Sequence, residues 1–283
     1  MPHGEERFET NDGLQLHENR WLPETTPVGV VVLVHGFTEH SGRYAQLATE
    51  LNNHGYAVYA IDLRGHGKSE GPRVFIRSFE QHLDDVEQYV QQVRRIEPNK
   101  PVFLLGHSMG GTIIVSLAAT RRPDADGLVV SGAALMIGDD VFPILRRLAS
   151  VVGRVFPKLA VVKMGSKMLS RDPAVVAHFD NDPLVFHNRF PVRTGAEILR
   201  AARQVRANLP SVRLPILILQ GTADTVIDPE GSRELYTQSG SADKTLKLYE
   251  GLYHDLFHEP ERDQVTADLI AWLDGRCRAD APA

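Results

Sequence analysis

The sequence predicts an α/β fold in which a mainly parallel central sheet is flanked by helices and carries an inserted helical cap. Short apolar runs rich in β-branched residues alternate with segments of helical length and period along most of the chain. Strands separated by helices are joined by right-handed crossovers, which place neighbouring strands parallel. Between residues 138 and 210 the alternation stops, and helix-like stretches interrupted by prolines, with no convincing strand, take its place. This break predicts the insertion.

The individual elements follow from the apolar patterns. Continuous apolar runs, typical of strands buried on both faces, predict strands at 30–34, 56–61, 102–105, 127–130, 216–219 and 246–249. Residues 14–18 alternate between polar and apolar and are expected to form an edge strand. Helices are expected at about 43–53, 79–96, 110–121, 230–238 and 262–275. We therefore assign 1–137 and 211–283 to the core domain and 138–210 to the cap.

Length, charge and cysteine content restrict the class of protein. A chain of 283 residues suits one large domain, or a core with an insertion. The formal net charge of -5 gives no electrostatic case for binding nucleic acid or an anionic membrane. The only cysteine, Cys277, excludes an internal disulfide and a cysteine zinc cluster. The polar N-terminal residues do not resemble a signal peptide, and no run reaches the roughly 20 apolar residues of a membrane-spanning helix. We expect a cytoplasmic protein.

The segment Gly106-His107-Ser108-Met109-Gly110 is the most informative stretch of the chain. It has the G-x-S-x-G pattern of a nucleophile elbow, between the strand at 102–105 and the helix at 110–121. The two glycines let strand and helix pass close together, and the turn presents the Ser108 hydroxyl above the sheet edge. The Met109 N–H opens the helix and can donate to an oxyanion. The alternative is a glycine-rich loop with an incidental serine, but the flanking strand and helix favour the elbow.

A serine hydroxyl needs a base, and the base needs an orienting acid. In open-sheet hydrolases these residues follow the order serine, acid, histidine. Asp224 lies just past the strand at 216–219 in a glycine-containing turn, which is the position expected for the acid. Asp228 is the alternative, but it precedes Pro229 and is better explained as a helix cap.

The base is expected after the last strand. His254 is the first histidine beyond the strand at 246–249. His258 is the alternative, but Glu259-Pro260 follows it and suggests a surface turn. Most of the other histidines, including His17 and His82, are interpreted as surface residues. Position after the last strand therefore favours His254.

Two glycine-containing loops follow early strands. The strand at 30–34 leads into His35-Gly36-Phe37, so the Phe37 N–H is the candidate for the second oxyanion donor. The loop at 65–69 ends like a phosphate-binding P-loop, but Asp62 stands where that motif requires glycine. We interpret this second loop as a structural turn in which Asp62 pairs with Arg64.

Taken together, these segments resemble the α/β-hydrolase superfamily, and more narrowly the monoacylglycerol lipases and related lysophospholipase-like serine hydrolases. The resemblance is carried by residues 35–44, 62–69, 106–111, 221–224 and 249–254, and in the cap by 170–173 and 181–185. It implies that Ser108 is the nucleophile, His254 the general base and acid, and Asp224 the orienting carboxylate. It also implies that Phe37 and Met109 supply the oxyanion N–H groups, that Glu39 and Arg43 lie near the polar end of the pocket, and that no metal or cofactor is needed.

The cap has features suited to a lipid substrate. Residues 141–145 and 148–156 are apolar stretches interrupted by Arg146, Arg147 and Arg154. They could line an acyl tunnel, with Leu145 and Phe156 contacting substrate, and could touch a membrane or lipid surface transiently. The alternative is that they only pack the cap onto the sheet.

The expected activity is hydrolysis of monoacylglycerols to free fatty acid and glycerol through an acyl-enzyme, so the expected partner is a small lipid ester. Lysophospholipase, broad carboxylesterase and thioesterase activities are the alternatives on the same site. A non-catalytic binding protein on the same fold is a further alternative, against which the complete set of triad residues argues. The oligomeric state and the acyl chain length are left open by the sequence.

Overall fold

The computed structural model describes residues 3–137, 156–163 and 165–277. Its centre is an eight-stranded sheet with the order β1-β2-β4-β3-β5-β6-β9-β10. Adjacent strands from β4 to β10 are parallel, whereas β2 is antiparallel to both β1 and β4. The predicted mainly parallel sheet is confirmed. The strands are β1 His3–Glu9, β2 Gln15–Trp21, β3 Gly29–Val34, β4 Tyr56–Ile61, β5 Val102–His107, β6 Gly127–Ser131, β9 Ile216–Gly221 and β10 Lys244–Tyr249.

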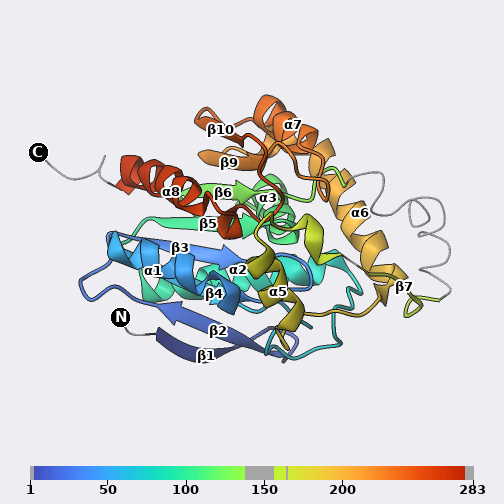
Figure 1. The fold of residues 1–283 in the computed structure, drawn as a ribbon. Helices are drawn as coiled ribbons and strands as arrows, with labels where there is room; N and C mark the ends of the chain where they lie inside the picture. The colour runs from blue at the N-terminus through green and yellow to red at the C-terminus, as the bar shows by residue number, and fades with distance from the viewer. Residues whose placement is uncertain (1–2, 138–155, 164, 278–283) are drawn as a thin grey trace, which may run out of the picture.

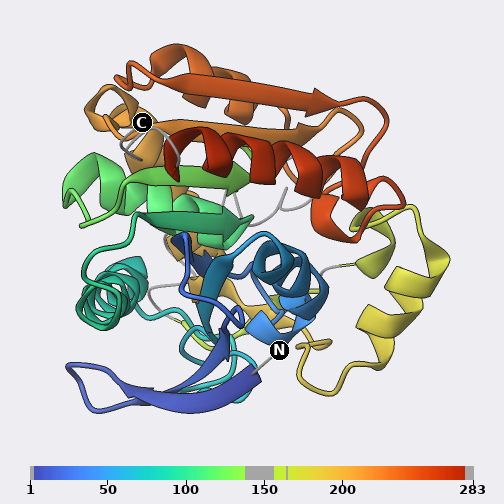
Figure 2. The ribbon, with the colours of Figure 1, turned by 90° about the vertical axis from the view of Figure 1, so that its left-hand side faces the viewer.

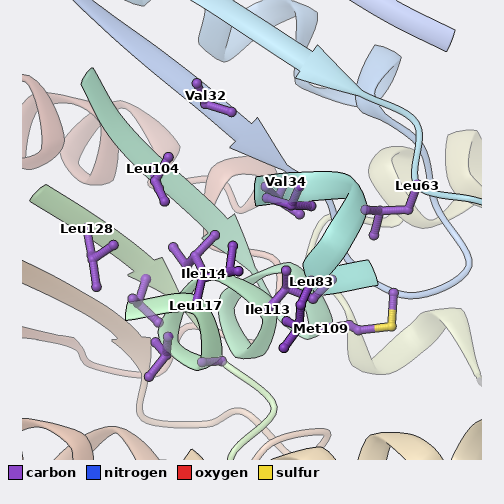
Figure 3. Packing of buried hydrophobic residues seen from close by; sticks show 14 of the residues in the cluster. Val32, Val34, Leu63, Leu83, Leu104, Met109, Ile113, Ile114, Leu117 and Leu128 are labelled. Atoms are coloured by element: carbon purple, nitrogen blue, oxygen red, sulfur yellow. The ribbon is translucent and has the colours of Figure 1, made fainter. Parts of the chain in front are cut away.

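Helices cover both faces of this sheet (Figures 1 and 2). They are α1 Ala45–Asn53, α2 Phe79–Ile96, α3 Met109–Thr120, α6 Val192–Ala207, α7 Glu230–Gln238 and α8 Arg262–Cys277. Successive strand residues point to opposite faces. Val31 and Leu33 therefore join the core layer under α1 and α8, whereas Val32 and Val34 join the layer under α2, α3 and α6. Figure 3 shows this second layer, in which Val32 and Leu104 face the helix that carries Ile114.

The outer strand of the sheet was not predicted. An edge strand is expected at residues 14–18, but residues 15–18 belong to β2, and β1 pairs along its outer side from His3 opposite Trp21 to Glu9 opposite Gln15. The prediction of an edge position is therefore wrong. In β1 only Phe8 is buried, so this strand shows no alternation of polar and apolar residues that a sequence pattern could reveal.

The insertion contains two short strands, which contradicts the expectation that it has none. β7 Ala160–Val162 pairs with β8 Phe190–Pro191 in an antiparallel ladder. Strands of two or three residues are too short to show a period. Between them lie the 3-10 turn η2 Ser166–Met168 and the helix α5 Pro173–Asn181, which begins where the Asp172 carboxylate accepts the Ala174 N–H at 2.8 Å.

The last helix of the segment 138–210 belongs to the main core. This helix, α6, packs against α3 and contributes Ile198, Ala201 and Val205 to that core. By contrast α5 lies beyond the carboxyl ends of the parallel strands (Figure 1). The apolar stretch 141–145 and most of 148–156, with Leu145 and the three arginines, lie outside the described residues. Within the described part of the chain, no helix has both the length and the apolar character needed to cross a bilayer.

Candidate active site

Ser108 lies on a strained turn between β5 and α3. Its backbone angles are φ 53° and ψ -115°, a region that L-residues rarely occupy and that costs on the order of 1–3 kcal/mol. The surrounding structure holds it there, because its N–H donates to Ser131 O at 2.9 Å and its carbonyl accepts the Ala134 N–H at 3.1 Å. A side chain at Gly106 would come within 2.5 Å of Gly110 O, which explains the glycine at that position. The turn therefore has the geometry expected of a nucleophile elbow.

Asp224 lies just past β9 and is buried, and both oxygens of its carboxylate accept hydrogen bonds. Its Oδ1 accepts the backbone N–H groups of Val226 and Ile227, each at 2.9 Å, and its Oδ2 accepts His254 Nδ1 at 2.7 Å and Gln220 Nε2 at 3.0 Å. Burial acts to raise the pKa of Asp224, but the interactions with His254 and these donors outweigh burial and lower it. Asp224 therefore remains ionised and can orient the imidazole.

Gln220 is a supporting residue that the sequence reasoning missed. It lies within β9, is fully buried, and donates to Asp224 while its Oε1 accepts the Ser232 hydroxyl at 2.8 Å. The signal available in the sequence was a polar residue in an otherwise apolar strand. By contrast, Asp228 accepts the Glu230 N–H at 2.9 Å at the start of α7, as expected of a capping residue.

His254 follows β10 and is 2% exposed. Burial acts to lower its pKa, but the Asp224 carboxylate outweighs burial and raises the pKa above the ordinary histidine value. This interaction favours the imidazolium, which is the form that arises when a base accepts a proton from serine. The neighbouring His107 lies 4.7 Å from His254 between ring centroids, and burial lowers its pKa to about 4, so it is neutral near pH 7.

Ser108 and His254 line one cavity of about 520 Å³ at the carboxyl ends of the strands, together with Phe37. Among the described residues, no hydrogen bond joins Ser108 to His254. In ligand-free enzymes such bonds are often long and tighten only when substrate binds. The cavity is thus large enough for a small ester, and Asp224, which does not line it, bonds the His254 side chain that does.

The two predicted oxyanion donors flank Ser108. Met109 is the first residue of α3, where a helix leaves its backbone N–H without an intrahelical acceptor. Phe37 lies in the loop after β3, and its ring contacts Phe190 edge-on at 5.0 Å. A side chain at Gly36 would approach Ser108 Cβ to 3.2 Å, so the backbone of this loop lies directly beside Ser108.

Glu39 and Arg43 line the same cavity and form a buried ion pair. Arg43 also donates to Asp255 at 2.9 Å, and Glu39 accepts the Tyr44 hydroxyl at 2.7 Å. Burial acts to raise the pKa of Glu39, but Arg43 outweighs burial and lowers it to about 2. The guanidinium carbon of Arg43 also lies 4.8 Å from the centroid of the Phe179 ring in α5, so this network of charged residues contacts the segment 138–210.

Several local interpretations of polar residues are corrected by the structure. His258 does not lie in a surface turn, because it hydrogen-bonds Asp255 at 2.8 Å, and the adjacent Glu259 is fully buried and pairs with Arg171 at 2.7 Å. The histidines His17 and His82, expected on the surface, are 8% and 1% exposed.

The expected pair between Asp62 and Arg64 is also wrong. Asp62 accepts the Ser41 and Lys68 N–H groups at 2.8 Å, while Arg64 pairs with Asp85 and with Asp12. Both residues stabilise the loop after β4, but each does so through a different part of the chain.

The sequence predicts that Leu145 and Phe156 contact the acyl chain and that no metal is needed. Leu145 lies outside the described residues, and Phe156 is 64% exposed rather than part of the cavity lining. Within the part of the chain that the structure describes, no group of three histidine, cysteine, aspartate or glutamate side chains is arranged to hold a metal ion.

Comparison with known proteins adds independent findings. The serine aminopeptidase S33 family matches residues 25–261. The chain is 36% identical over 269 residues to the monoacylglycerol lipase of Mycolicibacterium smegmatis, covering 95% of this chain and 96% of that one. It is 37% identical over 268 residues to the monoglyceride lipase of Homo sapiens, covering 94% and 88%. The crystal structure of Paleococcus ferrophilus monoacylglycerol lipase superposes with a TM-score of 0.82 at 34% identity, covering 98% of this chain and 100% of that chain.

Proposed function

The chain belongs to the serine aminopeptidase S33 family and has the α/β-hydrolase fold, and on this premise we propose that it cleaves monoacylglycerols to free fatty acid and glycerol. It is a carboxylic ester hydrolase, related over nearly its full length to monoacylglycerol lipases. The observation that carries the choice of site is the 2.7 Å bond from the buried Asp224 to His254, which lines the same cavity as the strained Ser108.

In the acylation step Ser108 Oγ attacks the acyl carbonyl carbon while His254 Nε2 takes the hydroxyl proton. The carbonyl electron pair moves to the oxygen, and the N–H groups of Phe37 and Met109 donate to this oxyanion. The carbon–oxygen bond to glycerol then breaks, and His254 returns its proton to the glycerol oxygen. The products of this step are glycerol and an ester between Ser108 and the fatty acid.

In the deacylation step water replaces glycerol. His254 takes a proton from the water as it attacks the acyl carbon, and the same two N–H groups stabilise the second oxyanion. Breakdown of this intermediate releases the fatty acid and returns the proton to Ser108. The position of Asp224 against Nδ1 supports this sequence, because it keeps Nε2 free of a proton before each attack.

Substrate recognition is proposed to use both ends of the cavity. Glu39 and Arg43 lie among the lining residues and are held by their own ion pair, which supports a role in binding the glycerol hydroxyl groups. The acyl chain would extend toward the insertion, for which we retain the boundaries 138–210, with 1–137 and 211–283 as the core. Lysophospholipase, carboxylesterase and thioesterase activities remain alternatives that a panel of head groups separates.

A monoacylglycerol is expected to be a better substrate than a triacylglycerol of the same chain length, by about tenfold or more in kcat/KM. A cavity of about 520 Å³ can enclose one ester group and part of one chain, whereas three chains compete for the same space. The measurement is hydrolysis of mono-, di- and triacylglycerols, lysophosphatidylcholine and an acyl thioester at matched chain lengths. Comparable activity on emulsified triacylglycerol would contradict the proposal, and a preference for lysophosphatidylcholine or the thioester would favour an alternative.

We also propose a transient contact between the insertion and lipid surfaces. Phe156 and Leu159 are 64% and 50% exposed, and the exposed Lys158 lies between them. Exposed apolar side chains beside a cation are typical of peripheral membrane contact. Phe156 belongs to the stretch 148–156 on which the expected lipid contact rests, whereas Leu159 lies just beyond it and extends the contact surface.

The double substitution Phe156→Ser with Leu159→Ser is therefore expected to reduce co-sedimentation with phosphatidylcholine–phosphatidylglycerol vesicles several-fold, because two exposed apolar side chains are lost from the surface that contacts lipid. Hydrolysis of a short soluble ester should be retained, because neither residue lines the cavity. Val28→Ser is the matched control. Val28 is 48% exposed, but it directly precedes β3 and so lies at the amino ends of the parallel strands, away from the cavity at their carboxyl ends. Unchanged vesicle binding, or none in the wild type, refutes the contact.

A further inference from the structure

The loop that carries the candidate oxyanion donor Phe37 is held by a buried histidine that the mechanism above does not use. His35 is fully buried, with Nε2 2.9 Å from the Leu63 backbone nitrogen and Nδ1 2.7 Å from Gly36 O. A backbone N–H can only donate, so Nε2 must be the acceptor and Nδ1 must carry the proton. His35 Nδ1–H therefore donates to the Gly36 carbonyl.

This carbonyl belongs to the same peptide unit as the Phe37 N–H. A peptide unit is planar, and in the trans form its C=O and N–H point in opposite directions. The described part of the chain contains no cis peptide bond. A hydrogen bond that fixes the Gly36 carbonyl therefore also fixes the direction of the Phe37 N–H, although His35 never touches that group.

The other end of Gly36 is held as well. Its N–H donates to Glu39 Oε1 at 2.6 Å, and its Cα lies so close to Ser108 that an added Cβ would be 3.2 Å from Ser108 Cβ. Two buried side chains thus hold the two peptide units that meet at Gly36: Glu39 bonds the His35–Gly36 unit, and His35 bonds the Gly36–Phe37 unit. A rotation of this peptide would turn the Phe37 N–H away from the oxyanion.

These two hydrogen bonds hold a loop that contains a strained residue. Thr38 has φ 69°, which is unusual for a β-branched residue, and its carbonyl accepts the Phe186 N–H at 2.9 Å. Relaxation of Thr38 to an ordinary conformation would rotate the adjoining backbone. Burial lowers the pKa of His35, so the imidazole is neutral. A neutral ring keeps Nε2 as an acceptor for the Leu63 N–H, and this bond leaves the proton on Nδ1.

We propose that His35 is a positioning residue for the oxyanion hole, which acts by holding the Gly36 carbonyl so that the Phe37 N–H points at the developing oxyanion. The inference rests on the proposed function, because it assigns His35 a part in the same reaction. It differs from a purely structural role because it concerns one ring nitrogen: the Nδ1 donor affects the oxyanion hole, whereas the Nε2 acceptor only anchors Leu63.

Two amide variants separate the ring nitrogens. The Asn side chain can place an N–H near the position of Nδ1 and keep the donor to Gly36 O, whereas Gln can place its oxygen near Nε2 and keep only the acceptor for Leu63. Each variant loses one buried hydrogen bond, so their losses of stability should be similar. His35→Gln is expected to lower kcat for monoacylglycerol hydrolysis by roughly 10–100-fold with little change in KM, and His35→Asn by less than about threefold.

Inhibitor binding gives a readout that a merely structural role would not change. An alkyl trifluoromethyl ketone forms a bond from Ser108 Oγ to its carbonyl carbon, with the serine proton passing to His254 and the negative charge resting on the ketone oxygen. The His35→Gln enzyme should bind this ketone at least about tenfold more weakly than the His35→Asn enzyme. The negative charge of the adduct lies in the oxyanion hole, and only His35→Asn keeps the donor that holds the Phe37 N–H in place. An ether analogue of monoacylglycerol has no carbonyl to form an oxyanion and should bind all variants equally.

The outcomes are distinguishable. Equal kcat and equal ketone affinity in folded H35Q and H35N proteins overturn the role of His35, as does parallel weakening of the ether analogue. If H35Q does not fold, His35→Leu lacks the same donor and takes its place in the comparison. Absence of hydrolysis by the wild type refutes the proposed function instead, while ketone affinity still tests His35 at Ser108.

Discussion

Ser108→Ala is expected to reduce kcat for monoacylglycerol hydrolysis by roughly 10⁵–10⁶, leaving a residual rate from the oxyanion hole and substrate binding. The alanine side chain has no oxygen to form the acyl-enzyme, while the backbone at φ 53° is held by the same hydrogen bonds to Ser131 and Ala134. The measurement is initial rates on a medium-chain monoacylglycerol, with circular dichroism and thermal melts to establish that the fold is intact.

A second serine of α3 provides the matched control. Ser116 is 5% exposed, and its hydroxyl bonds the Thr112 carbonyl at 2.7 Å, away from the cavity. Ser116→Ala should keep hydrolysis within about twofold and change stability by no more than about 1 kcal/mol. If Ser108→Ala retains activity within tenfold of the wild type, Ser108 is not the nucleophile.

Asp224→Asn is expected to lower kcat by roughly 10⁴, the scale seen when the orienting aspartate of a serine triad becomes an amide. The Asn oxygen must face the N–H groups of Val226 and Ile227, so its NH₂ group would replace Oδ2. That group would confront two donors, Gln220 Nε2 and His254 Nδ1–H. The imidazole would be driven to the tautomer with its proton on Nε2, which cannot accept the serine proton.

Asp228→Asn tests the same chemical change four residues away. Asp228 caps α7 through the Glu230 N–H, and asparagine is as good a cap as aspartate. Its kcat should therefore remain within about twofold of the wild type. Rates on a soluble ester near pH 8, together with thermal melts of both variants, make the comparison. A greater loss of activity in D228N than in D224N would show that Asp228, and not Asp224, is the acid of the triad.

Much of the core fold is determined by local sequence. The runs at 30–34, 56–61 and 102–105 identify strands because each is buried on both faces and remains apolar without interruption. The helix at 79–96 is found at the predicted boundaries for the complementary reason, since one face is buried and the other is polar.

The candidate triad is also accessible to sequence reasoning. In a parallel sheet the carboxyl ends of the strands meet at one edge, so residues that directly follow β5, β9 and β10 must lie near one another. Ser108 and Asp224 could therefore be chosen by their positions along the chain, and His254 by following the last strand.

Only the tertiary structure decides how polar residues from distant segments pair. The bond from Arg43 to Asp255 joins residues separated by 212 positions, and no local pattern encodes that choice of partner. The same limit explains the wrong pairing of Asp62 with Arg64, whose partners come from other elements. His82 is a different case, because its helical spacing from Phe79 and Val86 already places it on the buried face of α2, and its polarity alone suggests the surface.

The fine geometry of the candidate site belongs to the same category. The sequence places His35, Gly36 and Phe37 after a strand, but the tautomer of His35 depends on the Leu63 N–H, which the fold brings from the end of the neighbouring strand. Likewise Gln220 orients Asp224 only because Ser232 of α7 reaches its amide oxygen. Apolar burial is set by composition and period within a segment, whereas a buried hydrogen bond requires two groups at one distance and angle, which only the packed chain provides.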